Sequence, residues 1–589
     1  MSLQTVTIKT DLCVIGGGLS GLCAALSAAR HGAKVVLMHE RPMLGGNASS
    51  EIRMWISGAH GRDNRETGII EELLLENQYR NPDKNYSIWD SVLYQKAHEQ
   101  KNLTLLLNCS CMDAETVDGR IISVTGWQMT TQLFRKVEAS LFIDASGDSI
   151  LAPLSGASYR HGREARAAYG EDIAPEEEDS HTMGLSCLLQ ATETDEPHPY
   201  IAPSFAEKIH KDQLIHRVPE MSSPMENFWY LESGGLKNAI LDAEETRDEL
   251  LGLAYGMWDY LKNDPDEGPK HRNWRLDWVG ALPGKRESRR YVGAYTMTQH
   301  DVTRGGFFDD EIAYGGWTMD DHHPAGFRTT EPPTIYHPAP SPYGISFSCL
   351  YSTEVKNLMF AGRNISVTHT AMSSTRVMAT CALLGQAAGT AAALAIQKNC
   401  LPAEIARNHI RMLQNTLMDD DCYLPHFKRS VSALCQSAAL SGDGTGLECL
   451  RDGTDRPRGG DSHAWTGKIG DVITYTFAEP SSIKRIRIVT DSDLNRDTLP
   501  EPENRMERNM FHNRPKGLKP SHMPTTVLRA FRLSARFANG SECVLAEESN
   551  NHNRLWRCYV NADDCIALSL TPLATWGAEI VRIFAFEAE

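Results

Sequence analysis

The chain has 589 residues, and its 76 acidic and 59 basic side chains give a net charge of −17 at pH 7. This length exceeds what one hydrophobic core usually organises, so we expect about three or four domains. The net acidity, without a basic stripe interleaved with aromatic residues, argues against a nucleic-acid partner. The 14 cysteines follow no repeating spacing and no leader-like segment opens the chain, so we expect reduced thiols and a cytoplasmic location.

Residues 11–40 have the pattern of a strand, a glycine turn, a helix and a second strand that ends in an acid. Gly16, Gly18 and Gly21 form G-x-G-x-x-G directly after the first apolar run. The first two glycines let the backbone turn and approach a pyrophosphate, and the third lets the helix pack on the strand. Glu40 stands where an acid would bind a ribose hydroxyl. The segment therefore predicts a bound dinucleotide.

The next segment, RPMLGGNASSE over residues 41–51, distinguishes between nicotinamide and flavin dinucleotides. It resembles the second glycine motif of FAD-dependent oxidoreductases of the fumarate reductase and succinate dehydrogenase type. The resemblance implies that this stretch lies close to FAD through Arg41, Gly45, Gly46, Asn47, Ala48 and Ser49. Covalently flavinylated members carry a histidine close to this motif, whereas here Asn47, Ala48 and Ser49 occupy the stretch and His60 comes later, so we expect non-covalent FAD.

Two later segments extend the resemblance to about residues 8–425. Residues 141–148, LFIDASGD, are similar to the segment that returns to the adenosine side of FAD, and residues 357–395 to the last strand and the long helix under the flavin. Further implied FAD contacts are Asp144, Gly147, Asp148, Gly362, Arg363, Ser374, Thr375 and Arg376. In such proteins the N-terminus of the last helix faces the flavin pyrimidine, where helix amides and an arginine would stabilise negative charge. Arg376 has a second interpretation, as the partner of an acid elsewhere in the fold.

The predicted fold class is an α/β FAD-binding domain, Rossmann-like and of the glutathione-reductase type, with an inserted α+β substrate domain and a C-terminal all-β sandwich. The expected FAD-binding domain covers residues 1–155 and 345–428, the substrate domain 156–344 and the sandwich 429–589. The longest apolar run, residues 381–396, is shorter than the ~20 residues needed to span a bilayer. We therefore expect a buried, closely packed helix and no membrane partner.

After about residue 430 the sequence changes to short alternating stretches, which predict a β-sandwich. Residues 450–467, LRDGTDRPRGGDSHAWTG, and the paired strands after them resemble discoidin-like, galactose-binding-like modules. Some of these modules bind glycans and others pack against a partner domain, and both alternatives stay open here. The Asn, Arg, His and Pro-rich insertion at 495–524 predicts either disorder or a subunit contact, so a homo-oligomer also stays open.

Histidines near the expected flavin edge are the candidates for acid–base chemistry, because alcohol oxidation needs a base for the hydroxyl proton. His369 precedes the last helix, and His322 and His323 follow two aspartates in the substrate domain. Arg286 and Arg289, in KRESRR, could hold an anionic or polyhydroxylated substrate, or could form internal ion pairs. No convincing ligand set accompanies the histidines, so we predict no metal.

The preferred function is an FAD-dependent oxidoreductase that transfers hydride between flavin N5 and a small polar substrate, a saccharide or polyol. One alternative is reduction of an activated alkene, with Arg286 or Arg289 as proton donor. Another is a flavin-holding, glycan-binding protein without turnover. No second dinucleotide motif or C-x-x-C pair is evident, so the electron acceptor stays unknown.

Overall fold

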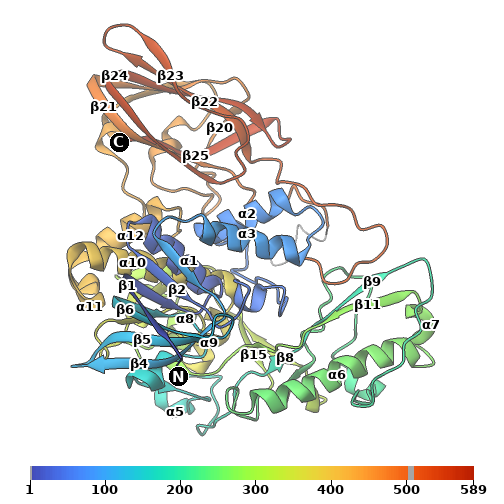
Figure 1. The fold of residues 1–589 in the computed structure, drawn as a ribbon. Coiled ribbons are helices and arrows are strands. Elements are labelled where there is room, and N and C mark those ends of the chain that lie inside the picture. Colours follow the sequence, from blue (N-terminus) through green and yellow to red (C-terminus); the bar gives the residue numbers. More distant parts are fainter. Residues whose placement is uncertain (1–2, 502–509) are drawn as a thin grey trace. The chain divides into compact units, whose positions relative to one another are not determined.

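The computed structural model describes residues 3–501 and 510–589 and divides into two compact units (Figure 1). Among the described residues, the first unit comprises 3–60, 83–413 and 510–520, and the second comprises 61–82, 414–501 and 521–589. Both units therefore combine segments that lie far apart in the sequence.

A seven-stranded sheet organises the first unit, in the strand order β3-β2-β1-β6-β5-β4, with β18 paired to β6 (Figure 1). Its strands are β1 (Thr5–Ile15), β2 (Val35–Met38), β3 (Leu103–Leu106), β4 (Cys109–Val117), β5 (Arg120–Gln128), β6 (Leu133–Asp144) and β18 (Leu358–Phe360). The pairs β1–β2, β2–β3, β1–β6 and β6–β18 are parallel, so their carboxyl ends meet at one edge. Ligands of open parallel sheets bind at this edge.

Two helices of small residues pack closely against each other beside this sheet, α1 (Leu19–Arg30) and α10 (Met378–Lys398). A Cβ atom added at Gly385 would lie 2.0 Å from the carbonyl oxygen of Ser20, and one at Gly389 would lie 2.1 Å from that of Ala24. The hydroxyls of Ser27 and Thr390 are 2.7 Å apart. The glycines thus let the two helix backbones touch.

The 21 residues of α10 correct the prediction from sequence that this helix is too short to cross a bilayer. Among residues 3–501 and 510–589 it is the helix that is long and apolar enough to do so. However, 94% of its most apolar window is buried inside the protein. The expected buried, closely packed helix is therefore what the structure contains.

The inserted part of the first unit is a set of short antiparallel sheets with one long helix, α6 (Ala243–Asn263). The helix packs its apolar face, which includes Leu253 and Trp258, on the ribbon of β9 (Leu189–Glu193) and β11 (Trp274–Val279). The remaining pairs and triplets are β7 (Tyr159–Arg160) with β13 (Arg290–Tyr291), β8 (Leu185–Ser186) with β10 (Glu232–Ser233) and β12 (Gly284–Lys285), β14 (Glu311–Gly315) with β17 (Tyr343–Ser346), and β15 (Met319–His322) with β16 (Thr334–His337).

Shorter helices complete the first unit. They are α3 (Tyr86–His98), α4 (Leu151–Ser155), α5 (Arg166–Tyr169), α7 (Gly268–His271), α8 (Gln299–Thr303), α9 (His369–Thr375) and α11 (Pro402–Glu404). A π-helical turn (Ile405–His409) separates α11 from α12 (Ile410–Asp419).

Residues 510–520 form an arm that joins the first unit although the insertion that holds them follows β21 of the sandwich. Arg514 pairs with β9 like a strand residue, since its amide donates to Ala191 O at 2.8 Å and its carbonyl accepts from Glu193 N at 2.9 Å. The imidazole of His512 lies 2.7 Å from the Tyr86 hydroxyl. The described part of the predicted insertion is thus ordered by intramolecular contacts, and its remaining residues, 502–509, lie outside the described residues.

The second unit holds an all-antiparallel β-sandwich, which confirms the predicted fold class together with the α/β sheet. Its strands are β19 (Ala439–Gly442), β20 (Trp465–Lys468), β21 (Ile473–Thr490), β22 (Leu528–Phe537), β23 (Glu542–Glu548), β24 (Leu555–Thr575) and β25 (Ile580–Ala588), and its helices are α2 (Ile69–Arg80) and α13 (Ala433–Ser437). The pairing of the long strand β21 with β24 contains register shifts, which let β21 bend without ending.

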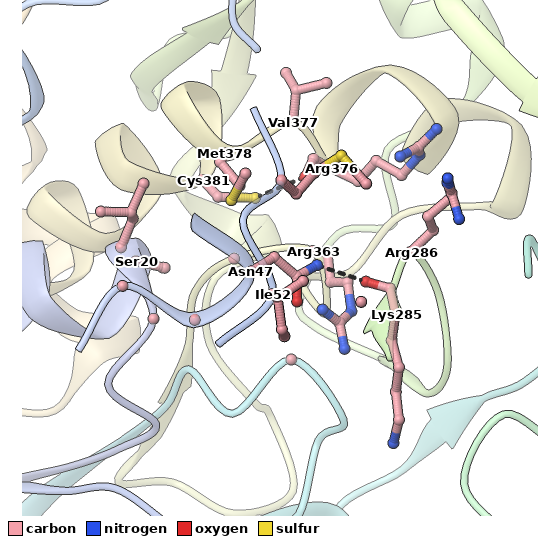
Figure 2. Close-up of a pocket in the computed structure, with 18 of the residues that line it drawn as sticks. Ser20, Asn47, Ile52, Lys285, Arg286, Arg363, Arg376, Val377, Met378 and Cys381 are labelled. Atoms are coloured by element: carbon pink, nitrogen blue, oxygen red, sulfur yellow. Dashed lines mark hydrogen bonds between the residues drawn. The ribbon is translucent and has the colours of Figure 1, made fainter. Parts of the chain in front are cut away.

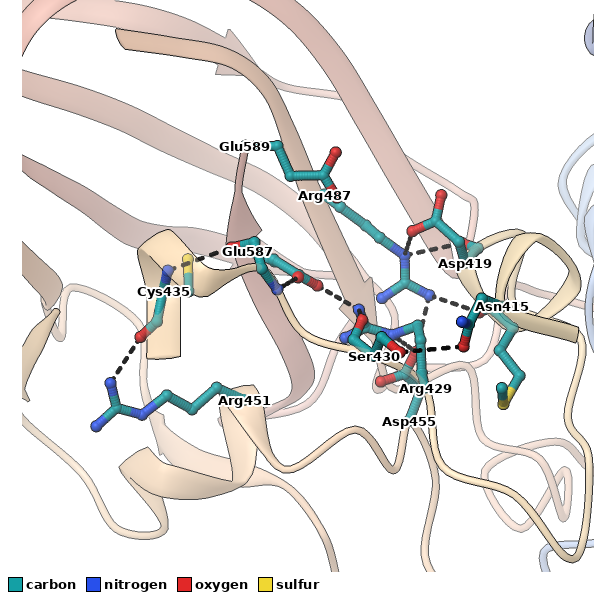
Figure 3. Close-up of polar contacts among 12 residues, drawn as sticks. Asn415, Asp419, Arg429, Ser430, Cys435, Arg451, Asp455, Arg487, Glu587 and Glu589 are labelled. Atoms are coloured by element: carbon teal, nitrogen blue, oxygen red, sulfur yellow. Dashed lines mark hydrogen bonds and ion pairs between the residues drawn. The ribbon is translucent and has the colours of Figure 1, made fainter. Parts of the chain in front are cut away.

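A buried network of ion pairs lies in the second unit, where the residues after α12 meet the sandwich strands (Figure 3). One carboxylate oxygen of Asp455 accepts from Arg487 Nη2 at 2.7 Å and from Arg429 Nε at 3.2 Å. Arg429 also pairs with Glu587, and Arg487 Nε donates to Asp419 O at 2.9 Å. Burial alone would raise the pKa of Asp455, but the two guanidinium groups lower it to about 2. The network is therefore charged at neutral pH.

Candidate functional site

A cavity of about 440 Å³ opens at the carboxyl edge of the parallel strands in the first unit. The loops that follow β1, β2, β6 and β18 supply its dinucleotide side. Predicted cofactor residues that line it are Gly16, Gly18, Glu40, Arg41, Gly45, Gly46, Asn47, Gly147, Asp148, Gly362, Arg363 and Arg376. Residues from four separate parts of the sequence therefore meet around one space.

The glycines of the two predicted motifs bring two backbone turns together. Gly16 has φ of +99°, and an added Cβ would lie 2.4 Å from the carbonyl oxygen of Ala145. Gly18 forms an isolated bridge with Gly45, and a Cβ at Gly46 would lie 2.9 Å from the Cα of Gly18. Around Gly18 itself the nearest atom to an added Cβ is 3.8 Å away, so the turn leaves open space at the start of α1. No side chain caps this helix terminus, whose amides can bind a phosphate.

Just after β2 stands Glu40, the acid expected to bind a ribose hydroxyl of the dinucleotide. His39 Nδ1 accepts from Gly17 N at 2.9 Å, and its Nε2 lies 3.0 Å from Met43 O. Burial would raise the pKa of Glu40, but the guanidinium of Arg41, whose Nε lies 3.5 Å from the carboxylate, lowers it. Glu40 is thus an ionised acceptor, suited to ribose hydroxyls.

The middle of the cavity is built from oppositely charged residues on three loops, of which Figure 2 labels the cations Lys285 and Arg363. Asp148 pairs with Lys285 at 2.6 Å and with Arg363 at 2.9 Å. Burial would raise its pKa, yet these two cations lower it to about 2. Asn47 donates to the carbonyl oxygen of Lys285 at 2.9 Å. The second glycine motif is thus tied to the segment that contains Lys285 and Arg286.

Some predicted cofactor residues do not line the cavity but are buried behind the residues that do. A Cβ atom added at Gly21 would lie 1.8 Å from the carbonyl oxygen of Gly16. The absence of a side chain at Gly21 therefore allows α1 to start close to the turn. Asp144 accepts from Leu151 N at 2.8 Å and from the Tyr291 hydroxyl at 2.6 Å. The other wall residues are Ala48, Ser49, Ser374 and Thr375, each buried.

The last long helix, α10, follows the predicted segment that ends at Arg376. Ser374 and Thr375 belong to α9, and α10 starts at Met378, which lines the cavity together with Val377. Arg376 stands between the two helices and donates through Nη2 to a carboxylate oxygen of Asp320 at 3.3 Å. Its Nε is buried and has no hydrogen-bond partner among the described residues. Both interpretations of Arg376 thus have support. Asp320 is its acid partner, and its Nε is available to donate to a ligand.

Beyond the charged middle, the cavity is walled by aromatic and charged side chains of the inserted part. Trp229, Trp317 and Tyr336 supply the rings, and Arg286, Asp320 and His322 supply the charges. Arg286 donates to the carbonyl oxygens of Gly184 at 3.1 Å and Trp229 at 3.0 Å. In Figure 2 the guanidinium groups of Arg286 and Arg376 lie on the same side of the cavity.

His322 is the histidine of the three predicted ones that lines the cavity. Its Nδ1 lies 2.7 Å from a carboxylate oxygen of Glu232, and its Nε2 lies 3.4 Å from Asp320. Burial would lower the pKa of His322, but the charges of Glu232 and Asp320 raise it above the usual value. The ring of Trp229 meets the imidazole edge-on at 5.4 Å.

Three other predicted catalytic residues lie outside the cavity lining. His369 is 4% exposed and contacts Glu287 and Asp321. His323 Nδ1 accepts from Ala325 N at 3.1 Å within a turn. The guanidinium of Arg289 lies over the ring of Tyr159 at 5.3 Å. Of the KRESRR segment, only Lys285 and Arg286 line the cavity.

Sequence reasoning did not identify Glu232, Trp229 and Trp317 as site residues. Glu232 follows a tryptophan and a tyrosine in FWYLES, and only the tertiary fold brings it to His322. Trp317 lies just before the two aspartates in the segment GGWTMDDHHPAG, so its position was one available signal.

The dinucleotide side of the cavity fits FAD. It has an acid placed for the ribose, a glycine turn that leaves space for the pyrophosphate, and hydrogen-bond donors beside that turn. The hydroxyl of Ser20, Nη1 of Arg41 and Nε of Arg363 are buried without hydrogen-bond partners among the described residues. These donors lie near the uncapped start of α1 or across the turn from it, where a pyrophosphate would accept them. Among the described residues, no group of three or more His, Cys, Asp or Glu side chains is placed to hold a metal.

Comparisons with known proteins give one short sequence match and several structural ones. A 72-residue stretch is 36% identical to glycerol-3-phosphate dehydrogenase of Mycobacterium leprae and spans 12% of each chain. A geranylgeranyl bacteriochlorophyll reductase-like protein of Thermoplasma acidophilum has 12% identity and a TM-score of 0.31, over 70% of this chain and 86% of that one. A family 32 carbohydrate-binding module of Streptococcus pneumoniae EndoD has 12% identity and a TM-score of 0.20, over 27% and 99%.

The matched stretch is thus a small part of the curated relatives, and at these TM-scores neither solved structure bears on function. The wider match is to a family. Residues 11–417 match the family described as FAD dependent oxidoreductase, which is more than half of the 589 residues. The chain belongs to this FAD dependent oxidoreductase family, and its cofactor is FAD.

Proposed function

We propose that this protein oxidises a hydroxyl group of a saccharide or another polyol. One observation carries the proposal: the FAD cavity continues into a compartment that holds an imidazole between two carboxylates and is walled by Trp229 and Trp317. Sites for small polar molecules commonly pair aromatic walls with a few convergent polar groups. The curated relatives, named glycerol-3-phosphate dehydrogenases, support oxidation of an alcohol, over the 12% of the chain that they match.

His322 is the proposed base for the hydroxyl proton. When bound, FAD would accept a hydride from the substrate carbon. Glu232 lies 2.7 Å from Nδ1 of His322, and Nε2, which lies 3.4 Å from Asp320, is the atom that would receive the hydroxyl proton from the neutral imidazole's substrate. As the carbonyl forms, the hydroxyl proton moves to Nε2, and the carboxylates of Glu232 and Asp320 stabilise the resulting imidazolium.

Arg286 and the indoles have a positioning role in this proposal. Arg286 already bonds two carbonyl oxygens, so its guanidinium has a fixed direction and its remaining N–H groups can donate to substrate oxygens. Trp229 and Trp317 offer flat apolar surfaces that suit the C–H faces of a sugar ring. Both features favour a ring-shaped polyol over an extended apolar molecule.

The test is anaerobic addition of a panel of sugars and polyols to the FAD-loaded protein while the visible flavin absorbance is followed. Bleaching by one member, with turnover when an artificial electron acceptor is added, is the expected result. His322→Gln should retain the same FAD absorbance and lose about 10²–10⁴-fold of the bleaching rate. Bleaching at an unchanged rate in the variant would remove His322 from the mechanism.

Reduction of an activated alkene is a second candidate, favoured by the place of Arg286. Burial lowers the pKa of this guanidinium, which lines the cavity, whereas Arg289 does not line it. Reoxidation of dithionite-reduced protein by an enoate, together with no bleaching by any sugar, would favour this reaction.

A further inference from the structure

Behind the cavity wall lies a buried charged cluster centred on the imidazole of His369. Its Nδ1 is 3.0 Å from each carboxylate oxygen of Glu287, and its Nε2 is 3.1 Å from Asp321. The side chain of Glu287 is 0% exposed and that of Asp321 is 26% exposed. One imidazole thus joins two carboxylates on different segments.

These two segments also carry the polar groups of the substrate compartment. Glu287 directly follows Arg286, and Asp321 lies between Asp320 and His322 on β15. Successive side chains of a strand point to opposite faces, so Asp320 and His322 share the face opposite Asp321. Accordingly Arg286, Asp320 and His322 line the cavity, and Glu287 and Asp321 do not. His369 therefore contacts both segments on the side that faces away from the cavity.

Charges on several other elements face this cluster. Glu164 accepts from His369 N at 2.8 Å and from Arg290 Nη2 at 2.7 Å, and Arg290 also pairs with Glu287. Arg163, which is paired with Asp179, lowers the pKa of Asp321 together with His369, against the effect of burial. Thr368 at the start of α9 donates to Glu171 at 2.6 Å. The carboxylates around α9 thus outnumber the arginines, and a protonated His369 reduces the imbalance.

We propose that His369 is a positioning residue: as an imidazolium it ties the segment of Arg286 to β15 and thereby sets Arg286 relative to Asp320 and His322. The role in turnover rests on the function proposed above, whereas the ionic tie itself does not. Burial would lower the pKa of His369, but Glu287 and Asp321 raise it to about 10. The tie is complete below the unfolded histidine pKa of about 6.5 and is lost as pH rises through about 10.

The first experiment observes the tie without any turnover. Protein loaded with FAD and labelled with ¹⁵N-histidine is titrated, with His369→Gln used to assign the resonance. At about pH 8.5, two units above the unperturbed histidine value, the His369 ring should still carry both protons. In Asp321→Asn its titration midpoint should fall by about one unit or more. A neutral His369 ring at that pH would overturn the proposal, whatever the substrate proves to be.

The second experiment measures the consequence for catalysis, using the sugar that bleaches the flavin. His369→Gln should keep its FAD and lose about 10–100-fold in kcat/KM, as is typical when a residue behind a site is removed. His198→Gln is the matched control, since its ring lies outside the cavity lining and contacts Thr194 in a loop. Activity of His369→Gln within twofold of the wild type would contradict the positioning role.

A double variant separates positioning from general loss of structure. If His369 acts through Asp321, His369→Gln with Asp321→Asn should be no less active than His369→Gln alone, because the two changes remove one interaction. Losses that multiply would count against the tie. Should His369→Gln fail to fold, Asp321→Asn alone carries the kinetic test, since its side chain is partly exposed. If no sugar bleaches the flavin, the proposed function fails while the titration still decides the tie.

Discussion

At the scale of single residues, the cavity is made of charges that already have a partner before any ligand binds. Asp148 is held by Lys285 and Arg363, and His322 is held by Glu232 and Asp320. Such pairing fixes direction and protonation state, so a bound molecule meets groups that need no rearrangement. What remains unpaired, such as Arg376 Nε, marks where a ligand atom has room to bond.

The raised pKa of His322 predicts how the oxidation depends on pH. A base acts only in its neutral form, and Glu232 and Asp320 raise the pKa of His322 against the effect of burial. The rate of sugar oxidation should therefore rise with pH and reach half its plateau above the unperturbed value of about 6.5. Rates measured from pH 5 to 9 check this. In Glu232→Gln the midpoint should move to lower pH, and a midpoint that stays in place would contradict the assignment.

Glu40 predicts a specific loss of cofactor affinity. The Glu40→Gln variant keeps the shape but removes the charged acceptor for a ribose hydroxyl, so the FAD dissociation constant should rise about 10–100-fold. Fluorescence titration of apoprotein with FAD measures it. Glu138→Gln, on the sheet surface beside Lys9, is the control and should leave the affinity unchanged. An unaltered affinity in Glu40→Gln would place the adenosine elsewhere.

At the scale of elements, the FAD site depends on how closely α1 approaches α10. Ser20 stands at the first turn of α1, where its hydroxyl faces the cavity and its carbonyl lies against Gly385. Any side chain at Gly385 therefore pushes on the helix terminus that is expected to bind the pyrophosphate. A change in the packing of these two buried helices is thus expected to change the affinity for FAD as well.

Gly385→Ala tests this coupling. An added Cβ 2.0 Å from Ser20 O forces the helices apart, so the variant should lose about 1–3 kcal/mol of unfolding free energy and also bind FAD more weakly. Urea unfolding and FAD titration measure the two effects. Ser27→Ala, which removes only the hydrogen bond to Thr390, should cost about 1 kcal/mol with little change in FAD affinity.

Several elements could be predicted from the sequence because local signals determine them. The glycine turns at Gly16 and Gly45, the acid at Glu40 and the small-residue helix α10 each carry a pattern that a single fold explains. The substrate compartment could not be assembled this way. Glu232 and His322 are 90 residues apart and meet only through the packing of β10, β8 and β15, for which no motif exists. For the same reason the sequence did not separate His322 from His369.

At the scale of the whole molecule, both units contain carboxylates whose charge is stabilised by arginine or lysine. Asp148 serves in the first unit and Asp455 in the second, each with a pKa lowered to about 2 by its cations despite burial. Neither unit therefore relies on apolar packing alone, and both should respond to acid.

Acid should destabilise this protein in the pH range in which its ordinary carboxylates become protonated and below it. A carboxylate whose folded pKa lies below its unfolded value of about 3.9 contributes stability above that pH and loses it as pH falls through about 2. Each such group contributes about 2–3 kcal/mol at neutral pH. Urea midpoints measured between pH 7 and 3 should fall steeply below about pH 4. In Asp455→Asn the protein should be less stable at pH 7 and its urea midpoint should depend less on pH.

The arm at residues 510–520 has a consequence for how this protein can be rearranged. The first unit ends its main run at residue 413, yet it also needs the arm, whose Phe511 and His512 are buried in it, and the second unit likewise contains residues 61–82. A gene fragment that stops before the sandwich would leave Tyr86 and β9 without their covering strand residue. Recombination that exchanges the C-terminal module for another would have to keep the original arm, so the two units are expected to be inherited together.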